Sequence, residues 1–343
     1  MADYLIIIIS ILAVLAALAL ILFVLAAVSY KFAFGGRADK NPLLKYFTAA
    51  DFNLSATPIT VKSGKTDLNG FIYLSGNAPL NQTENLIIFA HGMGPGQIAY
   101  TTEIAYFCNR GATVLALDST GCNFSGGKSI KGMYEGAKTV LAAIGYVRTV
   151  PEFAKSKLTL IGHSWGGYSV LCAAAKAAQK IGAKQQKIDK IIAISAPCTP
   201  AKTIKNGAAR IIGKPLAVLL RPFWWIINLL KFGACGNASA AKSAKKAAES
   251  GAEVLLIHGD SDSIVAPENA VYFKVNKKEV KKHLAKGKAH NPYNTTSAET
   301  KLRQLNSAMM SKKLTPEEKK KFFKEFDFKA ATEEDEDVMQ IMI

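Results

Sequence analysis

The sequence predicts an α/β protein with a mostly parallel central sheet, helices on both faces, a helical cap and one transmembrane helix in front of it. Two patterns carry this prediction. Short apolar runs alternate with helical segments between residues 85 and 274, as in proteins built from βαβ units. A longer apolar run precedes them at the N-terminus. The 343 residues suit one large domain with appendages.

The N-terminal run is long enough to be a membrane anchor. Leu5 to Val28 is apolar apart from Ser10 and would cross a bilayer of roughly 30 Å. Tyr4 and Tyr30 lie at its ends, where aromatic rings prefer the membrane interface. A cleaved signal peptide would have a shorter apolar core behind basic residues. We therefore expect a transmembrane anchor over residues 1–30.

Basic residues on one side of the anchor predict its orientation. They follow the apolar run at Lys31, Arg37, Lys40 and Lys45, whereas only the α-amino group precedes it. The positive-inside rule therefore places the large domain on the cytoplasmic side of the cell membrane. Five cysteines without a C-x-x-C pair fit the same reducing compartment.

The formal net charge of +17 raises the question of a nucleic-acid partner. A nucleic-acid-binding domain would gather arginine and aromatic residues on one patch within a known module. Here the lysines are scattered, except over residues 274–288, and no such module occurs. We expect no nucleic-acid partner, and instead a charged surface that faces solvent or an anionic lipid leaflet.

The remaining elements follow from apolar periodicity. We expect a linker over residues 31–57, a main domain over residues 58–312 and a charged helical tail over residues 313–343. Alternation predicts a β-hairpin over residues 58–75. Strands are then expected at 85–90, 113–117, 158–161, 190–195 and 253–258, and helices at 102–109, 131–146, 168–180 and 268–274.

The segment from about 198 to 250 interrupts this alternation and is expected to form a cap over the carboxyl edge of the sheet. It contains the apolar stretch Arg210 to Gly233. The aromatic residues at 223–225 could line an acyl pocket, touch lipid or only pack against their own domain. Pro215 and Pro222, together with nearby basic side chains, argue against a second membrane-spanning helix.

The tail contains two helix-start patterns, Thr315-Pro316-Glu317-Glu318 and Thr332-Glu333-Glu334-Asp335. The first places proline in the first turn, and both place carboxylates at the positive end of the helix dipole. We expect solvated helices with narrow apolar seams, the last of them either docked on the sheet or free.

The stretch from 158 to 170 indicates chemistry. A buried strand at 158–161 is followed by G-x-S-x-G at Gly162 to Gly166 and then by a helix. This order is typical of a nucleophile elbow, a sharp turn that projects the serine hydroxyl above the sheet. Side chains at Gly162 or Gly166 would collide with neighbouring backbone. Ser164 is therefore the candidate nucleophile, with an ordinary Gly-Ser turn as the alternative.

A serine nucleophile needs a base, and a carboxylate must orient that base. His290 is the expected base because it lies in a loop at the sheet edge, after a lysine-rich segment around His283 that reads as a poor edge strand. His283 is the alternative, while His91 and His163 are expected to serve loop geometry and packing. The acid should follow the strand at 253–258, where spacing alone does not separate Asp260 from Asp262.

Two backbone amides are expected to bind the oxyanion. One is that of Trp165, the residue after the nucleophile, and the other is that of Met93, in the glycine-rich turn at 91–96. The sequence shows no constellation of metal ligands, and we expect neither a metal nor a cofactor.

The motifs occur in a fixed order: HGMGPG at 91–96, DSTGCNFSGG at 118–127, GHSWGG at 162–167, HGDSDSIV at 258–265 and GKAHNP at 287–292. From about residue 58 to residue 290 they resemble the α/β-hydrolase superfamily. They are most similar to its bacterial membrane-anchored esterases, monoacylglycerol-lipase-like enzymes and serine-aminopeptidase-type sequences. The resemblance implies Asp262 rather than Asp260 as the acid, and it supports the roles expected for the base and the two amides. Thr120 and Asn123 depart from the family's loop, where arginine and glycine are frequent, which leaves substrate preference open.

The resemblance implies a carboxylic ester hydrolase that acts on a small or lipid-derived ester through an acyl-enzyme on Ser164, His290 and Asp262. A peptidase or thioesterase would share every catalytic residue. Residues 207–236 contain no Asp or Glu that could hold a substrate amine, which favours an ester. A non-catalytic, membrane-associated binding protein is the alternative from another class.

Overall fold

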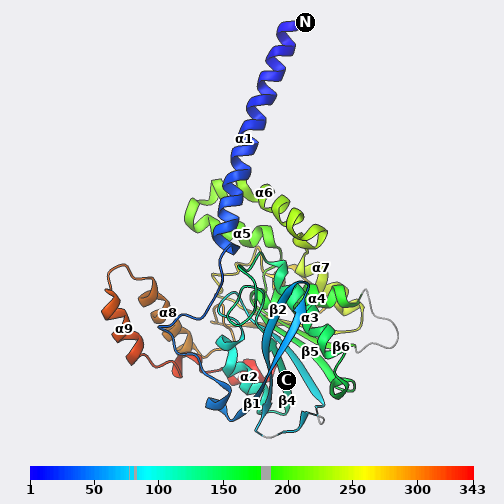
Figure 1. Cartoon of the computed structure of the whole chain (residues 1–343), viewed down its shortest axis with the longest axis vertical. Coiled ribbons are helices and arrows are strands. Elements are labelled where there is room, and N and C mark those ends of the chain that lie inside the picture. The colour runs from blue at the N-terminus through cyan, green and yellow to red at the C-terminus, as the bar shows by residue number, and fades with distance from the viewer. Residues whose placement is uncertain (77, 81–82, 179–186) are drawn as a thin grey trace.

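A long N-terminal helix projects from a domain whose central sheet is surrounded by helices (Figure 1). The computed structural model describes residues 1–343 apart from 77, 81–82 and 179–186. The sheet has 8 strands in the order β1-β2-β4-β3-β5-β6-β7-β8. The strands are β1 (Leu54–Ser63), β2 (Thr66–Ser75), β3 (Asn85–Ala90), β4 (Ala112–Leu117), β5 (Lys157–His163), β6 (Ile188–Ile194), β7 (Glu253–Gly259) and β8 (Lys281–Ala285).

The sheet is mostly parallel, as predicted. β1 and β2 form an antiparallel hairpin, and β2 pairs antiparallel with β4. Every further pair, from β4 across the sheet to β8, is parallel. Parallel strands bring their carboxyl ends to one edge, so the loops after β3, β5, β7 and β8 gather there.

The helices fall into three groups. The helices around the sheet are α2 (Thr101–Cys108), α3 (Tyr134–Val147), α4 (Trp165–Ala178), α7 (Ala240–Glu249) and α10 (Glu336–Gln340). The projecting helix is α1 (Ala2–Phe34), and the cap helices are α5 (Pro200–Ile212) and α6 (Lys214–Phe232). Two further helices, α8 (Thr296–Met310) and α9 (Pro316–Glu325), precede the C-terminal segment. Short 3-10 turns are η1 (Ala49–Phe52), η3 (Gln97–Tyr100), η4 (Pro151–Phe153), η5 (Gly233–Asn237), η6 (Val271–Lys274) and η7 (Ala330–Thr332). The last two positions of the helix expected at 168–180 lie outside the described residues.

Two hydrophobic clusters cover the two faces of the sheet. Side chains alternate along each strand, so Ile88 of β3 joins one cluster while its neighbours Ile87 and Phe89 join the other. The first cluster includes residues of α3, α4, α7 and the cap, and the second includes residues of α2 and α10. Helices therefore cover both faces, as predicted.

Helix α1 changes character near its C-terminal end. Its apolar side chains from Leu5 to Ile21 are exposed, whereas Ala26, Tyr30 and Phe34 are buried in the first cluster. By length and composition alone, two stretches of the described chain could cross a membrane. They are 3–34, whose most apolar window is 0% buried, and 214–249, whose window is 28% buried. The N-terminal stretch agrees with the expected apolar helix, which continues past residue 30 to Phe34.

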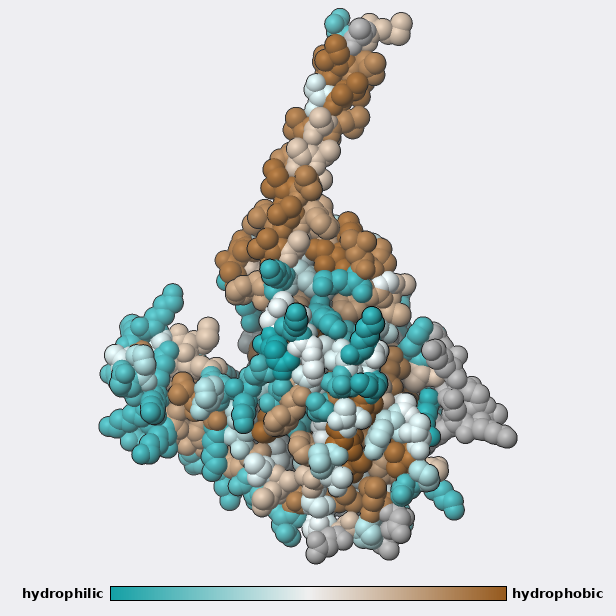
Figure 2. Space-filling view, in the orientation of Figure 1, coloured by the Kyte–Doolittle hydropathy of each residue, from teal (hydrophilic) through white to brown (hydrophobic). Residues whose placement is uncertain are grey.

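The segment between β6 and β7 contains the cap helices α5 and α6, the turn η5 and then α7. Figure 1 shows α6 lying across the base of α1 rather than alongside it. Pro222 lies inside α6, and the glycines at 213 and 233 flank the helix with positive φ angles. Figure 2 shows that the apolar surface of α1 continues onto this part of the cap.

The prediction of a helix over residues 268–274 is only partly correct, since η6 begins at Val271. Backbone pairing with the segment after β6 explains the difference. The Cys198 amide donates to the carbonyl of Asn269 at 2.6 Å, and the Val271 amide donates to the carbonyl of Ala196 at 3.0 Å. These groups are therefore not available for helical hydrogen bonds.

The last helix starts later than predicted. Asp335, not Thr332, is the N-cap of α10 and accepts from the amide of Val338. Residues 333–335 instead pair with 293–295, because the Thr295 amide donates to Glu333 and the Asp335 amide donates to Tyr293. The helix docks on the sheet, where Val338, Met339 and Met342 are buried in the second cluster.

Candidate active site

Ser164 lies at the turn between β5 and α4, at the carboxyl edge of the sheet. Its φ of 55° is in the left-handed region, which a non-glycine residue rarely adopts. Its amide donates to the carbonyl of Ile194 at 2.7 Å. A Cβ at Gly162 would overlap the backbone of Gly166, and a Cβ at Gly166 would overlap the carbonyl of Ala90. The strained turn and its glycines have the geometry of a nucleophile elbow.

Asp262 and His290 are in direct contact. Oδ2 of Asp262 lies 2.9 Å from Nδ1 of His290. Oδ1 of the same carboxylate accepts from the amides of Ile264 and Val265 at 2.8 and 2.9 Å. Both carboxylate oxygens therefore have hydrogen-bond partners, and the side chain is held in one orientation toward the imidazole.

The alternatives left open by sequence spacing lie elsewhere. Asp260 is exposed and accepts from the Gly287 amide at 2.9 Å, so it caps its loop. His283 lies within the edge strand β8, in register with Ile257 of β7. In the described part of the chain, no hydrogen bond joins Asp260 to a histidine. Geometry thus pairs His290 with Asp262.

The environment of Asp262 keeps its carboxyl ionised. Burial by itself would raise its pKa, but the hydrogen bond and charge of His290, with the amides of Val265 and Ile264, lower the pKa below its ordinary value. A carboxylate at Nδ1 fixes the tautomer of His290 with the proton on that nitrogen. The lone pair on Nε2 is then available to accept a proton.

His163, the residue before the serine, contacts the loop that carries His290. Its Nε2 lies 2.9 Å from the carbonyl oxygen of His290, and the two rings are 4.8 Å apart. Its Nδ1 lies 2.9 Å from the hydroxyl of Tyr100, which also accepts from the Gly92 amide at 3.0 Å. One hydrogen-bonded chain therefore joins the loops after β3, β5 and β8.

The backbone groups at the two ends of this hydrogen-bonded network determine which atom donates in each bond. A carbonyl only accepts, so Nε2 of His163 carries a proton and donates it to His290. Because the Tyr100 oxygen accepts from Gly92, its own proton is donated to Nδ1 of His163. Burial lowers the pKa of His163 to about 3, with the charge of His290 adding to the effect, so the ring is neutral as this scheme requires.

The amides of Met93 and Trp165 lie where an oxyanion site is expected. Trp165 is the first residue of α4, and an amide in the first turn of a helix has no partner within that helix. Among the described residues, no hydrogen bond to either amide nitrogen is present. His91 fixes the loop that carries Met93. Its Nε2 accepts from the Ser119 amide, and its Nδ1 then donates to the Gly92 carbonyl at 2.6 Å.

Ser164 itself is half-buried, and its hydroxyl makes no hydrogen bond to His290 in the described structure. Catalytic hydrogen bonds are often long in proteins without substrate and shorten in the complex. The absence of this bond is therefore compatible with a catalytic pair. The structure therefore brings the five predicted residues Met93, Ser164, Trp165, Asp262 and His290 to loops at one sheet edge.

Comparison with known proteins agrees with this fold. A family model described as alpha/beta hydrolase fold matches residues 85–215. The chain has the α/β-hydrolase fold, and the matched residues support the α/β-hydrolase superfamily. No curated protein sequence matches it.

Solved structures show the same fold at low sequence identity. An esterase of Pyrococcus furiosus, Pf2001, is 19% identical with a TM-score of 0.54, over 80% of this chain and 96% of the other. The acylaminoacyl peptidase of Pyrococcus horikoshii is 16% identical with a TM-score of 0.50, over 77% of this chain and 42% of the other. At this identity the likeness concerns the fold.

This α/β-hydrolase departs from its family in the loop after β4, where Thr120 and Asn123 replace frequent residues. The Thr120 hydroxyl donates to Glu135 at 3.0 Å. A guanidinium reaches the loop from another part of the chain, because Arg37 donates to the carbonyls of Gly127 and Asn123 at 2.6 and 2.7 Å. Sequence patterns within the loop could not reveal this contribution from the segment after α1.

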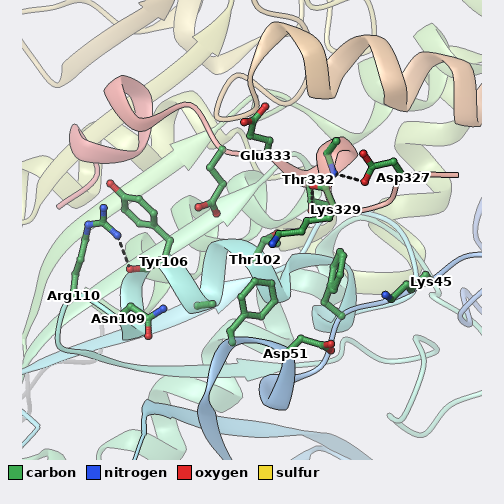
Figure 3. A pocket seen from close by; sticks show the side chains of 15 residues that line it. Lys45, Asp51, Thr102, Tyr106, Asn109, Arg110, Asp327, Lys329, Thr332 and Glu333 are labelled. Atoms are coloured by element: carbon green, nitrogen blue, oxygen red, sulfur yellow. Dashed lines mark hydrogen bonds between the residues drawn. The ribbon is translucent and has the colours of Figure 1, made fainter.

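A separate polar pocket of about 740 Å³ lies between η1, α2 and the C-terminal segment (Figure 3). Arg110 stacks over the ring of Tyr106 at its edge, 3.5 Å from the ring centroid. The pocket is not lined by any of the five candidate residues. Among the residues described, no group of His, Cys, Asp and Glu side chains is arranged to hold a metal ion.

Proposed function

We propose that this α/β-hydrolase is a membrane-anchored serine hydrolase that cleaves carboxylic esters. The observation that carries the proposal is the contact of 2.9 Å between Asp262 and His290 at the sheet edge that holds the strained Ser164 turn. The backbone amides of Met93 and Trp165, which have no hydrogen-bond partner among the described residues, supply donors for a developing oxyanion.

The proposed reaction proceeds in two halves. Nε2 of His290 takes the proton of Ser164 as Oγ attacks the ester carbonyl, and the amides of Met93 and Trp165 stabilise the oxyanion. The proton passes to the leaving alkoxide, which departs as an alcohol and leaves an acyl-enzyme. Water then attacks the acyl carbonyl, its proton passes through His290 to Oγ, and the carboxylic acid leaves. Asp262 stabilises the imidazolium in both halves.

An ester is favoured over an amide by the composition of the cap. Residues 207–236 carry no carboxylate that could bind a substrate amine. The amino acids around the proposed nucleophile would serve a peptidase or thioesterase equally well. Rates on p-nitrophenyl esters, monoacylglycerols, acyl thioesters and aminoacyl anilides would separate these substrate classes.

Labelling with a fluorophosphonate probe tests the nucleophile. We expect the wild-type protein to be labelled and Ser164→Ala to remain unlabelled, while Ser261→Ala, in the loop that carries Asp262, is labelled like wild type. Absence of labelling in the wild type, or equal labelling of Ser164→Ala, would favour the non-catalytic binding protein instead.

The proposed membrane anchor is α1. Its apolar side chains from Leu5 to Ile21 are exposed over a length that fits a bilayer, and so long an apolar surface is unfavourable in water. The charge asymmetry around the anchor supports a cytoplasmic domain. The proposed partners are thus the lipid bilayer and an ester substrate.

Orientation can be measured with a thiol reagent that does not cross membranes. Four native cysteines are buried and Cys235 is partly exposed, so Cys235→Ser gives a quiet background. Lys65→Cys then adds an exposed thiol in the β1–β2 turn. We expect labelling only after the cells are lysed, and labelling of intact cells would place the domain outside.

A further inference from the structure

An apolar cavity of about 570 Å³ lies between α1, the cap helices α5 and α6, and the loop after β3. Leu25, Val28 and Phe32 of α1 form one wall, and Ile204 and Gly207 of α5 contribute to the opposite wall. The cavity lies in the size range of ligand sites. The helix proposed to anchor the protein therefore also encloses a cavity of the soluble domain.

The side chains around the cavity can make only apolar contacts with a ligand. Among the residues that line it, Ser29 and Thr203 alone have polar side chains. The Ser29 hydroxyl donates to Ala26 and accepts from Trp224, and the Thr203 hydroxyl donates to Thr199 and accepts from Asn269. Neither hydroxyl is free for a polar ligand, so the cavity fits an alkyl chain.

The cavity shares one residue with the proposed catalytic site and touches a residue bonded to another. Met93, whose amide is a proposed oxyanion donor, lines the cavity. Met133 lines it as well, and its carbonyl accepts from the Trp165 indole at 2.6 Å. A chain in the cavity would thus have one end beside the residues that flank Ser164.

Helix α1 is fixed to the domain rather than tethered to it. The Trp224 indole of α6 donates to the carbonyl of Ala26 at 3.1 Å and to the Ser29 hydroxyl at 3.0 Å. The Tyr30 hydroxyl donates to Asn228 at 2.9 Å. These three bonds hold the last turns of α1 against the cap.

The segment after α1 is fixed as firmly. The Ile130 and Lys131 amides donate to the carbonyls of Gly36 and Phe34, both at 3.1 Å. Arg37 binds the carbonyls of the loop after β4, as described above. Because both ends of the junction are hydrogen-bonded to the domain, the cavity wall formed by α1 keeps its position.

We infer that the C-terminal part of α1 is a wall of the acyl-binding site, and that the cavity takes the acyl chain of an ester drawn sideways from the bilayer around α1. The inference rests on the proposed ester hydrolysis, and it adds to that reaction the class of substrate and its route. The anchor is then part of the specificity pocket.

A glycine in the cavity wall gives the first test. A Cβ at Gly207 meets no atom within 4 Å, so Gly207→Leu can extend into open space without a backbone clash. Gly145 of α3 is exposed and equally unobstructed, so Gly145→Leu is the matched control. Leucine also favours the helix more than glycine does at either position.

Full-length protein in lipid vesicles would be assayed with p-nitrophenyl butyrate and p-nitrophenyl palmitate. Because one methylene in an apolar pocket changes specificity by about tenfold or more, Gly207→Leu is expected to lower kcat/KM for palmitate at least tenfold. The butyrate rate should change less than about twofold. Gly145→Leu should leave both rates unchanged.

Substitution on the anchor tests the other wall. Val28 lines the cavity, while Val24, one turn earlier, is exposed and lies outside it. Val28→Trp is expected to cause the same selective loss of palmitate hydrolysis, whereas Val24→Trp is not. Equal palmitate rates in wild type, Gly207→Leu and Val28→Trp would overturn the inference while butyrate hydrolysis still supports an esterase. Loss of wild-type labelling and of butyrate hydrolysis would instead contradict the proposed function.

Dilution within the bilayer tests the route. At a fixed bulk concentration of palmitate ester, added inert lipid lowers its mole fraction in the vesicle membrane. A rate that falls with mole fraction supports entry from the bilayer. A rate that depends only on bulk concentration would show that the chain enters from water.

Discussion

The hydroxyl of Tyr100 lies 2.9 Å from Nδ1 of His163 and so connects the loop of the proposed oxyanion amide to the loop of the proposed base. Burial raises the pKa of Tyr100, so the hydroxyl keeps the proton that it donates. Because the same oxygen accepts from the Gly92 amide and His163 donates to the His290 carbonyl, the spacing of the two loops depends on one phenol.

Tyr100→Phe should therefore reduce activity more than stability. Removing the hydroxyl leaves the Gly92 amide and Nδ1 of His163 without their partner. This lowers the free energy of unfolding by about 1–3 kcal/mol. We expect kcat/KM for p-nitrophenyl butyrate to fall about tenfold, with the protein still folded by circular dichroism. Tyr106→Phe, which removes a hydroxyl bonded to Glu336 at 2.8 Å, is the control and should keep full activity.

Asp262→Asn should abolish most of the activity without unfolding the protein. An amide at this position no longer fixes the proton on Nδ1 of His290, and such a change in a Ser-His-Asp triad costs about 10⁴ in kcat. The matched variant Asp260→Asn alters a carboxylate only two positions away that caps its own loop, and it should retain activity. If the two variants lost activity equally, the assignment of the acid would be wrong.

Gly166→Ala should destabilise the protein strongly, because a Cβ there overlaps the carbonyl of Ala90. Overpacking against backbone costs about 3 kcal/mol or more in such a position. Thermal unfolding would show a lower Tm, or the protein would not accumulate. Gly145→Ala replaces an unobstructed helical glycine and should instead stabilise by about 0.5–1 kcal/mol.

Two buried glutamates, Glu334 at the separate pocket and its neighbour Glu103, predict a pH dependence of stability. Burial, with the charge of Glu103, raises the pKa of Glu334 to about 9, and burial raises the pKa of Glu103 to about 7. Between pH 4.5 and 9 these carboxyls bind more protons in the folded state than in the unfolded state, so their own contribution to stability is fully present below pH 4.5 and is lost as the pH rises through that window. Each proton contributes at most about 1.4 kcal/mol per pH unit.

Glu334→Gln replaces one of these carboxyls with a side chain that does not titrate. We expect the variant to gain stability relative to wild type as the pH rises from 5 to 9, when measured by urea unfolding, and to match it more closely below pH 4.5. Glu317→Gln, at the exposed start of α9, should show no such trend. A difference that did not grow with pH would mean that the pair is not coupled to folding.

Local sequence patterns were enough to predict the sheet, the elbow and the apolar N-terminal helix. The strand at 85–90 and the G-x-S-x-G turn need only neighbouring residues for their conformation, since burial and glycine sterics act over a few positions. Helix boundaries failed where backbone groups pair with distant segments, as at Val271 and at Asp335.

Residues that act through long-range contacts could not be found in this way. Tyr100 has no motif around it, His163 was expected only to support its loop, and Arg37 lies in what the sequence presents as a linker. Each acquires its role from partners 63 to 127 positions away or, for Arg37, 86 to 90 positions away. No sequence period reports such separations.

The sequence by itself determined the types and order of the proposed catalytic groups, because a nucleophile elbow and its partners follow from short motifs at strand ends. Spacing places the two carboxylates of that loop equally and the family resemblance implies Asp262, but only the tertiary structure brings Asp262 into contact with His290. It also decided that the anchor helix encloses a cavity beside Met93, because only packing of α1 against the distant α5 and α6 creates that wall.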